Sequence, residues 1–220
     1  MKVMIGPLLG LGGVAAILLA SEFFWRTRIF KRAETPRKLV HILTGTYVAF
    51  WPLFMTFHWI QVLSVLLFAM VFASKKLHLF RSIHSVNRPT YGELLFPLGV
   101  LVAAIFAQSG WVYMAAVLHL SLADGIAALV GVRHVKKFGY KVFGQPKTLI
   151  GTAAFYVTSL CIITATLLLD PAAYGGNAQL IILLLPLGTT FVENIAIYGT
   201  DNLFVPITVI VILDALRVIA

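Results

Sequence analysis

Long apolar runs separated by short polar connectors dominate the pattern of the chain. Most of the runs approach the roughly 20 apolar residues that a helix needs to cross a bilayer. The pattern predicts an all-α, polytopic membrane helix bundle with about eight transmembrane helices. The predicted spans cover residues 3–24, 39–55, 57–73, 94–107, 111–131, 150–169, 179–198 and 203–219.

These spans leave no room for a separate soluble domain, so we interpret residues 1–220 as a single transmembrane domain. Residues 1–35 form its first helix and a juxtamembrane basic stretch, and residues 36–215 form its core. Hydrophobic residues make up 60% of the chain and charged residues 11%, which is too little polar surface for a water-soluble globule. The single cysteine, Cys161, excludes an intrachain disulfide and a cysteine-based metal cage.

The formal net charge of +9 is concentrated in alternate connectors. Fifteen of the seventeen lysines and arginines lie in residues 25–38, 74–93 and 132–148. The positive-inside rule therefore predicts that these connectors, and any site they carry, face the cytoplasm. Membrane topology and anionic lipid head groups account for the charge, so no nucleic-acid partner is expected.

Acidic residues inside predicted spans are the first candidates for chemistry, because a carboxylate in a membrane is costly and usually functional. Asp124 precedes the basic end of its span by seven residues, about 10 Å, and Glu193 precedes the end of its span by five, about 8 Å. Asp201 follows in the next connector, on the same side. The three carboxylates are therefore predicted to meet near the cytoplasmic surface.

Basic residues accompany these acids at the same predicted level. Lys147 and Thr148 end a glycine-containing basic loop, and Arg37 and His41 share a helix face at i, i+4 spacing. Such a set suits a nucleoside triphosphate with Mg²⁺, which takes carboxylate and phosphate oxygens, while the imidazole suits phosphate binding or proton transfer. Basic loops, interfacial cations and small-residue helix packing are also ordinary in polytopic proteins.

The loop does not match the phosphate-binding loop of P-loop ATPases, because the glycines before Lys147 are wrongly spaced. Residue types alone leave a lipid kinase and a proton-coupled transporter both open. The order of five motifs along the chain is more specific. They read Arg37-Lys38-x-x-His41-x-x-x-Gly45, Tyr91-Gly92-Glu93-x-x-Phe96-Pro97, Ala123-Asp124-x-x-Ala127-x-x-x-Gly131, Lys147-Thr148-x-x-Gly151-Thr152, and Glu193 with Gly199-x-Asp201-Asn202-Leu203-x-Val205-Pro206.

This ordered set, over residues 36–215, resembles the CTP-dependent polyprenol kinases. That family includes dolichol kinase, phytol kinase and the CTP-type diacylglycerol kinase, with phosphatidate cytidylyltransferases as distant relatives. The resemblance implies transfer of the γ-phosphoryl group of CTP to a lipid alcohol at the cytoplasmic face, with Mg²⁺. Dolichol-like, phytol-like and diacylglycerol acceptors are all compatible with the sequence, and so is any oligomeric state.

Carried onto this chain, the resemblance implies a set of roles. We expect catalytic residues at Asp124, His41, Lys147 and Glu193, and metal ligands at Asp124, Glu193 and Asp201. The expected nucleotide contacts are Arg37, Lys38, Arg133, Lys136, Lys137, Gly144, Lys147, Thr148, Gly151 and Asn202.

Two alternatives remain at this point. A cytidylyltransferase would use the same CTP and Mg²⁺ but transfer CMP to a lipid phosphate, and the cations Arg37 and Lys38 suit such an acceptor. A transporter with intramembrane carboxylates would be expected to show inverted internal repeats, and no convincing repeat relates the two halves.

Overall fold

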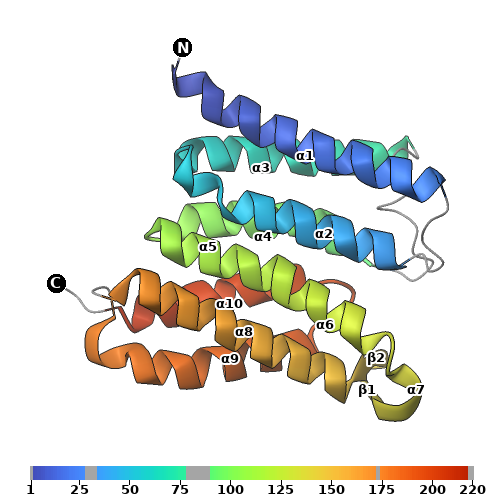
Figure 1. Cartoon of the computed structure of the whole chain (residues 1–220), viewed down its shortest axis with the longest axis vertical. Helices are drawn as coiled ribbons and strands as arrows, with labels where there is room; N and C mark the ends of the chain where they lie inside the picture. The colour runs from blue at the N-terminus through green and yellow to red at the C-terminus, as the bar shows by residue number, and fades with distance from the viewer. Residues whose placement is uncertain (1, 28–33, 78–89, 172–173, 218–220) are drawn as a thin grey trace.

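The computed structural model describes residues 2–27, 34–77, 90–171 and 174–217. Nine of the helices in this part of the chain have at least eight residues (Figure 1). They are α1 (Lys2–Arg26), α2 (Glu34–Ala49), α3 (Phe57–Lys76), α4 (Gly92–Phe106), α5 (Gly110–Leu118), α6 (Asp124–Gly131), α8 (Leu149–Leu169), α9 (Ala178–Ile195) and α10 (Asp201–Ala215). Shorter elements are α7 (Val135–Phe138), two 3₁₀ turns (Trp51–Leu53 and Gly175–Asn177), a π-helical turn (His119–Ala123), β1 (Gly139–Val142) and β2 (Gln145–Thr148).

Five segments among the described residues are long and apolar enough to cross a membrane. They are Met4–Arg26, Phe57–Lys76, Gly110–Gly131, Leu149–Leu169 and Gly175–Ile195. The helices α2, α4 and α10 are shorter, at 16, 15 and 15 residues, or roughly 22–24 Å. These three lengths are below the ~30 Å of a hydrocarbon core, so the predicted number of eight spans stays a prediction. The five long apolar segments are consistent with the predicted membrane helix bundle.

The α-helix α2 ends six residues before the end of the predicted span, and one reason is visible in the sequence. The predicted span 39–55 ends as an α-helix at Ala49, and the chain continues through a 3₁₀ turn that contains Pro52. Proline has no amide hydrogen to continue the α-helical ladder. The predicted span 111–131, by contrast, forms one continuous path through α5, the π turn and α6.

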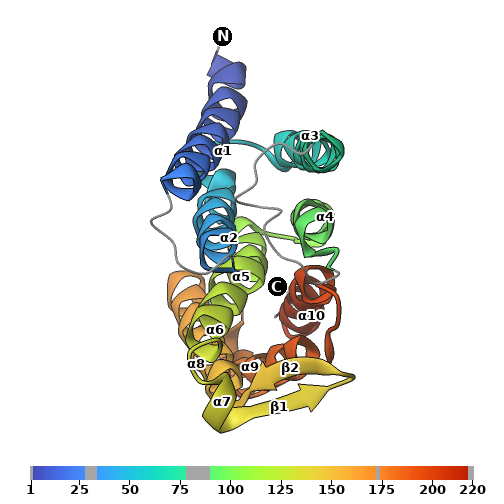
Figure 2. The same cartoon turned by 90° about the vertical axis from the view of Figure 1, so that its right-hand side faces the viewer.

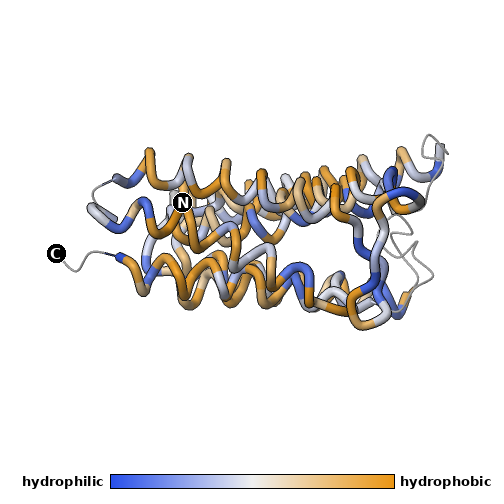
Figure 3. Tube along the Cα trace, turned by 90° about the horizontal axis from the view of Figure 1, so that it is seen from below, coloured by the Kyte–Doolittle hydropathy of each residue, from blue (hydrophilic) through white to orange (hydrophobic). Residues whose placement is uncertain are grey.

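That path lies at the centre of the bundle. In the most apolar stretch of the Gly110–Gly131 span 67% of the residues are buried, against 33% or less in the other four spans. Packed around it are α2, α8 and α10, while α4 lies between α3 and α10 (Figure 2). The outer helices instead expose large apolar side chains such as Leu8, Phe23 and Leu168, as a lipid-facing surface requires. Figure 3 shows that hydrophobic positions predominate along the helices.

The connection between α7 and α8 adds one short pair of strands to the predicted all-α bundle. The strands β1 and β2 form an antiparallel hairpin in which Gly139 pairs with Thr148 and Tyr140 with Lys147. Its two turn residues, Phe143 and Gly144, both have positive φ, at 46° and 79°. Two left-handed residues in a two-residue loop are what a tight hairpin turn requires.

The polar elements gather at one end of the bundle. There α1, α3 and α6 end, α2, α4, α8 and α10 begin, and the β1–β2 hairpin lies across the helix ends (Figures 1 and 2). Five of the basic residues that were predicted to face the cytoplasm lie at positions 28–33 and 78–89, outside the described residues. Which side of the membrane this end faces stays a prediction.

Candidate active site at the polar end of the bundle

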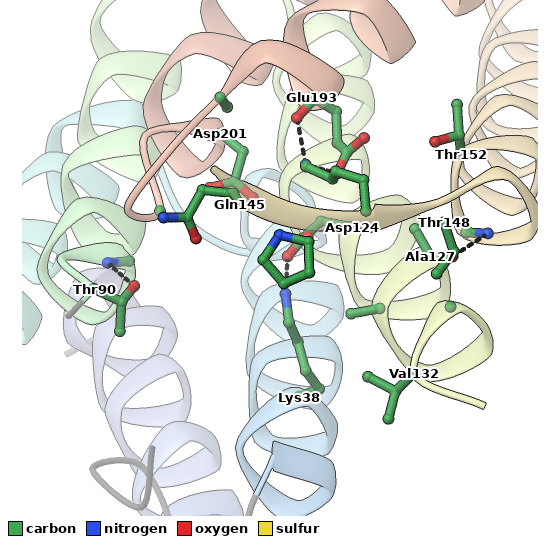
Figure 4. Close-up of a pocket in the computed structure, with 18 of the residues that line it drawn as sticks. Lys38, Thr90, Asp124, Ala127, Val132, Gln145, Thr148, Thr152, Glu193 and Asp201 are labelled. Atoms are coloured by element: carbon green, nitrogen blue, oxygen red, sulfur yellow. Dashed lines mark hydrogen bonds and ion pairs between the residues drawn. The ribbon is translucent and has the colours of Figure 1, made fainter. Parts of the chain in front are cut away.

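A pocket of about 340 Å³ opens at this polar end (Figure 4). Residues from α2, α4, α6, β2, α8, α9 and α10 line it. Four of those helices, α2, α4, α8 and α10, contribute residues of their first turns, where the helix dipole favours an anion. The backbone alone therefore makes the pocket suitable for phosphate groups.

The carboxylate of Asp124 is buried in this pocket, at 6% exposure. Lys38 Nζ donates a hydrogen bond to Asp124 Oδ2 at 2.6 Å, and His41 Nε2 lies 3.3 Å from the same oxygen. Lys38 and His41 are one turn apart on α2, so both reach the start of α6. A buried carboxylate between two nitrogen donors holds its charge without water.

Glu193 forms a second buried ion pair, with Lys147 of the hairpin. The ammonium of Lys147 donates to Glu193 Oε1 at 2.5 Å and to the Glu193 carbonyl oxygen at 2.7 Å. Opposite Lys147 in the hairpin, the Tyr140 hydroxyl donates to Asn194 Oδ1 at 2.9 Å and lies 2.6 Å from the Thr152 hydroxyl. These contacts fasten the hairpin to α8 and α9 beside the pocket.

Thr148 joins the hairpin to α8. Its hydroxyl oxygen accepts a hydrogen bond from the Gly151 amide at 3.0 Å and so caps the helix. A Cβ at Gly131 or at Gly151 would lie 2.8 Å from this hydroxyl oxygen. The two glycines of the motifs therefore allow α6 and α8 to approach each other at the pocket wall.

The third acid, Asp201, begins α10. Its Oδ1 accepts from the Asn202 amide at 3.1 Å, and the Asn202 side chain donates to the Gly92 carbonyl oxygen at 3.1 Å. Burial, followed by the charge of Asp124, raises the pKa of the Asp201 carboxyl. Asp201 has no ion pair with any lysine, arginine or histidine among the described residues, so it is the acid of the three that is most in need of a cation.

Nine of the predicted site residues line the pocket: Arg37, Lys38, Asp124, Lys147, Thr148, Gly151, Glu193, Asp201 and Asn202. His41 does not line it but contacts Asp124. Arg133, Lys137 and Gly144 lie outside it, with Arg133 and Lys137 exposed and Gly144 at the hairpin turn. The side chain of Lys136 is outside the described part of the structure.

Sequence reasoning missed several lining residues, among them Thr90, Gln145 and Tyr198. Gln145 was identifiable in principle. It lies two residues before Lys147, and side chains at i and i+2 of a strand share a face. A strand prediction for residues 145–148 would have placed both on the pocket.

The carboxylates fit Mg²⁺ as part of its coordination shell. Among residues 2–27, 34–77, 90–171 and 174–217, no group of three or more His, Cys, Asp or Glu side chains is arranged to hold a metal ion. Mg²⁺ in nucleotide sites commonly takes only one or two carboxylates and completes its shell with phosphate oxygens and water. The donor set of this pocket therefore suits a metal that arrives with a nucleotide.

Comparison with known proteins identifies the family. The phytol kinase of Synechocystis sp. is 30% identical over 204 residues, which span 88% of this chain and 84% of that protein. The chain belongs to the CTP-dependent polyprenol kinase family. No family model matches the chain. No solved structure matches it either.

All five motifs that carry the resemblance to the polyprenol kinase family reach this one pocket, although they are far apart along the chain. Each of them contributes at least one lining residue. In chain order these are Arg37 and Lys38; Gly92; Asp124, Ala127 and Gly131; Lys147, Thr148, Gly151 and Thr152; and Glu193, Gly199, Asp201 and Asn202.

Proposed function

We propose that this member of the polyprenol kinase family transfers the γ-phosphoryl group of CTP to the hydroxyl group of a lipid alcohol. The observation that carries the proposal is the pocket, which combines three acids and three cations at the polar end of a membrane bundle. Relationship to a phytol kinase supports a lipid alcohol as the acceptor. The density of basic residues in the connectors at this end supports a cytoplasmic position.

The cations would bind the phosphates. Arg37, Lys38 and Lys147 line the pocket next to the first turn of α8, where Thr148 and Gly151 lie. Lys38 and Lys147 hold carboxylates in the structure described above. Phosphate oxygens are alternative acceptors for the same ammonium groups, so bound CTP would share these two lysines with Asp124 and Glu193.

The acids would hold the metal and accept the proton. Asp201, together with Asp124 or Glu193, would bind Mg²⁺, which supplies neutralisation of the charge on the phosphates when it is bound. In the transfer, the alcohol oxygen attacks the γ-phosphorus, the bond to the β,γ-bridging oxygen breaks and CDP leaves. One of the carboxylates, Asp124 or Glu193, takes the hydroxyl proton.

The geometry of the pocket also suits exclusion of water, which would otherwise compete as an acceptor. The strand β2 runs across the pocket, and its residues Gln145 to Thr148 form part of the wall (Figure 4). The acids lie at the ends of apolar helices, so an alcohol can present its hydroxyl while its tail stays among lipid chains. Only the head of the substrate would need to enter the polar end.

The test is a transfer assay with the purified protein in lipid vesicles, with phytol, a polyprenol or diacylglycerol as the acceptor. We expect label from CTP labelled at the γ-phosphate to enter the lipid fraction, and label at the α-phosphate to stay in solution. Entry of the α-label would instead assign CMP transfer. Absence of both labels from lipid with each acceptor would overturn the proposed enzyme function.

A further inference from the structure

The central helix is irregular immediately before Asp124. In a regular α-helix the Asp124 amide would donate to the carbonyl oxygen of Leu120, four residues earlier. In the π turn His119–Ala123 it donates instead to the carbonyl oxygens of His119 and Ser121. The Leu120 carbonyl is thereby released from its helical partner in a residue that is only 1% exposed, where an unpaired carbonyl would be costly.

His41 of α2 supplies a donor to this carbonyl. Its Nε2 lies 2.9 Å from the Leu120 carbonyl oxygen and 3.3 Å from Asp124 Oδ2. A carbonyl oxygen only accepts hydrogen bonds, so Nε2 carries the hydrogen. The Phe96 ring packs against the imidazole at a centroid distance of 4.9 Å and limits its rotation. The imidazole is therefore held with its Nε2–H directed at the Leu120 carbonyl oxygen and at the Asp124 carboxylate.

The π turn also sets the direction of Asp124 itself. Each residue of an α-helix advances by about 100° around the axis, so one extra residue in a turn rotates everything after it by that amount. π turns of this kind occur frequently at functional sites. In this chain the irregularity does two things at once, because it turns Asp124 toward α2 and releases the carbonyl that orients His41.

The beginning of the π turn is fixed to the rest of the bundle. His119 is fully buried, its Nδ1 lies 2.7 Å from the Ala115 carbonyl oxygen, and its Nε2 lies 2.8 Å from the Ser159 hydroxyl. Ser159 in turn lies 3.1 Å from the Thr189 hydroxyl on α9. This polar chain ties the turn to α8 and α9, so the backbone that presents Leu120 is anchored on the side opposite α2.

From these contacts we propose that His41 is a positioning residue for Asp124 rather than a proton acceptor. It acts as a hydrogen-bond donor through Nε2, and the π turn is the backbone device that fixes it. The inference rests on the proposed phosphoryl transfer for its catalytic consequence. It differs from the prediction that His41 is itself a catalytic group, and the experiment below decides between the two roles.

Three substitutions at His41 separate the two roles. Glutamine carries an N–H at the position of Nε2 but cannot take up a proton, asparagine carries its N–H at the position of Nδ1, and alanine carries none. We expect His41→Gln to keep kcat within a few-fold of wild type. His41→Ala and His41→Asn are expected to lower kcat by about 10–100-fold, as for other residues that orient a ligand side chain, with a smaller change in the KM for CTP. His134→Ala is the matched control, because the His134 imidazole bonds to the Val130 carbonyl oxygen of its own segment and does not line the pocket.

Two results would overturn the inference. One is a His41→Gln protein that is folded but as inactive as His41→Ala, which would assign proton transfer to the imidazole. The other is a His41→Ala protein with wild-type kcat. Unfolding temperatures give a readout that does not need activity, and we expect His41→Gln to restore most of what His41→Ala loses. A wild-type protein without any transfer would refute the proposed function instead, while the unfolding series would still test the hydrogen bond.

Discussion

Replacement of Asp124 by asparagine should separate the charge of this side chain from its shape. Asparagine has the same size, so the position remains filled, but the ion pair with Lys38 is lost. Lys38 is itself buried, at 7% exposure, and its ammonium would then lie 2.6 Å from a neutral amide. The substitution therefore leaves an uncompensated buried charge as well as an incomplete active site.

The expected cost follows from the burial of both partners. Removal of one member of a buried ion pair costs about 3–5 kcal/mol, because the remaining charge stays out of water. The Lys38 side chain lines the open pocket and keeps 9% exposure, which favours the lower end, about 3 kcal/mol. The double variant Lys38→Met with Asp124→Asn removes the stranded charge, and we expect it to regain most of this stability while it remains inactive.

The measurement pairs an unfolding titration in SDS with the transfer assay in vesicles. We expect phosphoryl transfer by Asp124→Asn to fall at least 100-fold, on the scale of a lost catalytic group. If the double variant is as unstable as the single one, the stranded-charge argument is wrong. Near-normal transfer by folded Asp124→Asn would remove Asp124 from the mechanism.

Three further predictions concern the hairpin, the helix contacts and the metal. Lys147→Met should weaken the attachment of the hairpin to α9, where the Tyr140–Asn194 hydrogen bond remains. We expect it to raise the KM for CTP about tenfold or more and to speed amide exchange in residues 139–148, while Lys76→Met at the exposed end of α3 should change neither. Gly99→Ala would force a Cβ into the Asn202 carbonyl oxygen, and we expect a loss of about 1–3 kcal/mol in the SDS titration, whereas Gly12→Ala has open space and should be neutral. EDTA should abolish transfer and Mg²⁺ should restore it, with little change in the unfolding temperature of the free protein, because Asp124 and Glu193 already pair with lysines. Unchanged amide exchange in residues 139–148 of Lys147→Met would contradict the first prediction. Equal losses of stability in the two glycine variants would contradict the second, and phosphoryl transfer in EDTA would contradict the third.

The level of the acids along the helix axis could be predicted from the sequence. Counting residues from the ends of the spans placed Asp124 and Glu193 at similar depth, and both line the same pocket. Helical rise is nearly constant, so depth depends only on where the polar end begins. The partner of each acid could not be predicted this way. Spacing paired Arg37 with His41, whereas Lys38 and His41 are the residues that contact Asp124.

Rotation around the helix axis is the reason for that difference. A π turn shifts the face of every residue after it, and the sequence HLSLA contains no glycine or proline that would predict one. The hairpin could not be predicted either, since the strands GYKV and QPKT are only four residues long and, with their two lysines, glycine and proline, resemble an ordinary basic loop. Gly144, which was predicted to contact the nucleotide, has one of the two positive φ angles of the hairpin turn, and its nucleotide contact stays a prediction.

A structure of the protein in lipid nanodiscs with Mg²⁺ and a non-hydrolysable CTP analogue would test the central claim most directly. The account predicts triphosphate density inside the pocket, in contact with Lys38 and Lys147, and a metal ion against Asp201 and one further acid. Nucleotide bound elsewhere, with both lysines still paired to Asp124 and Glu193, would contradict it.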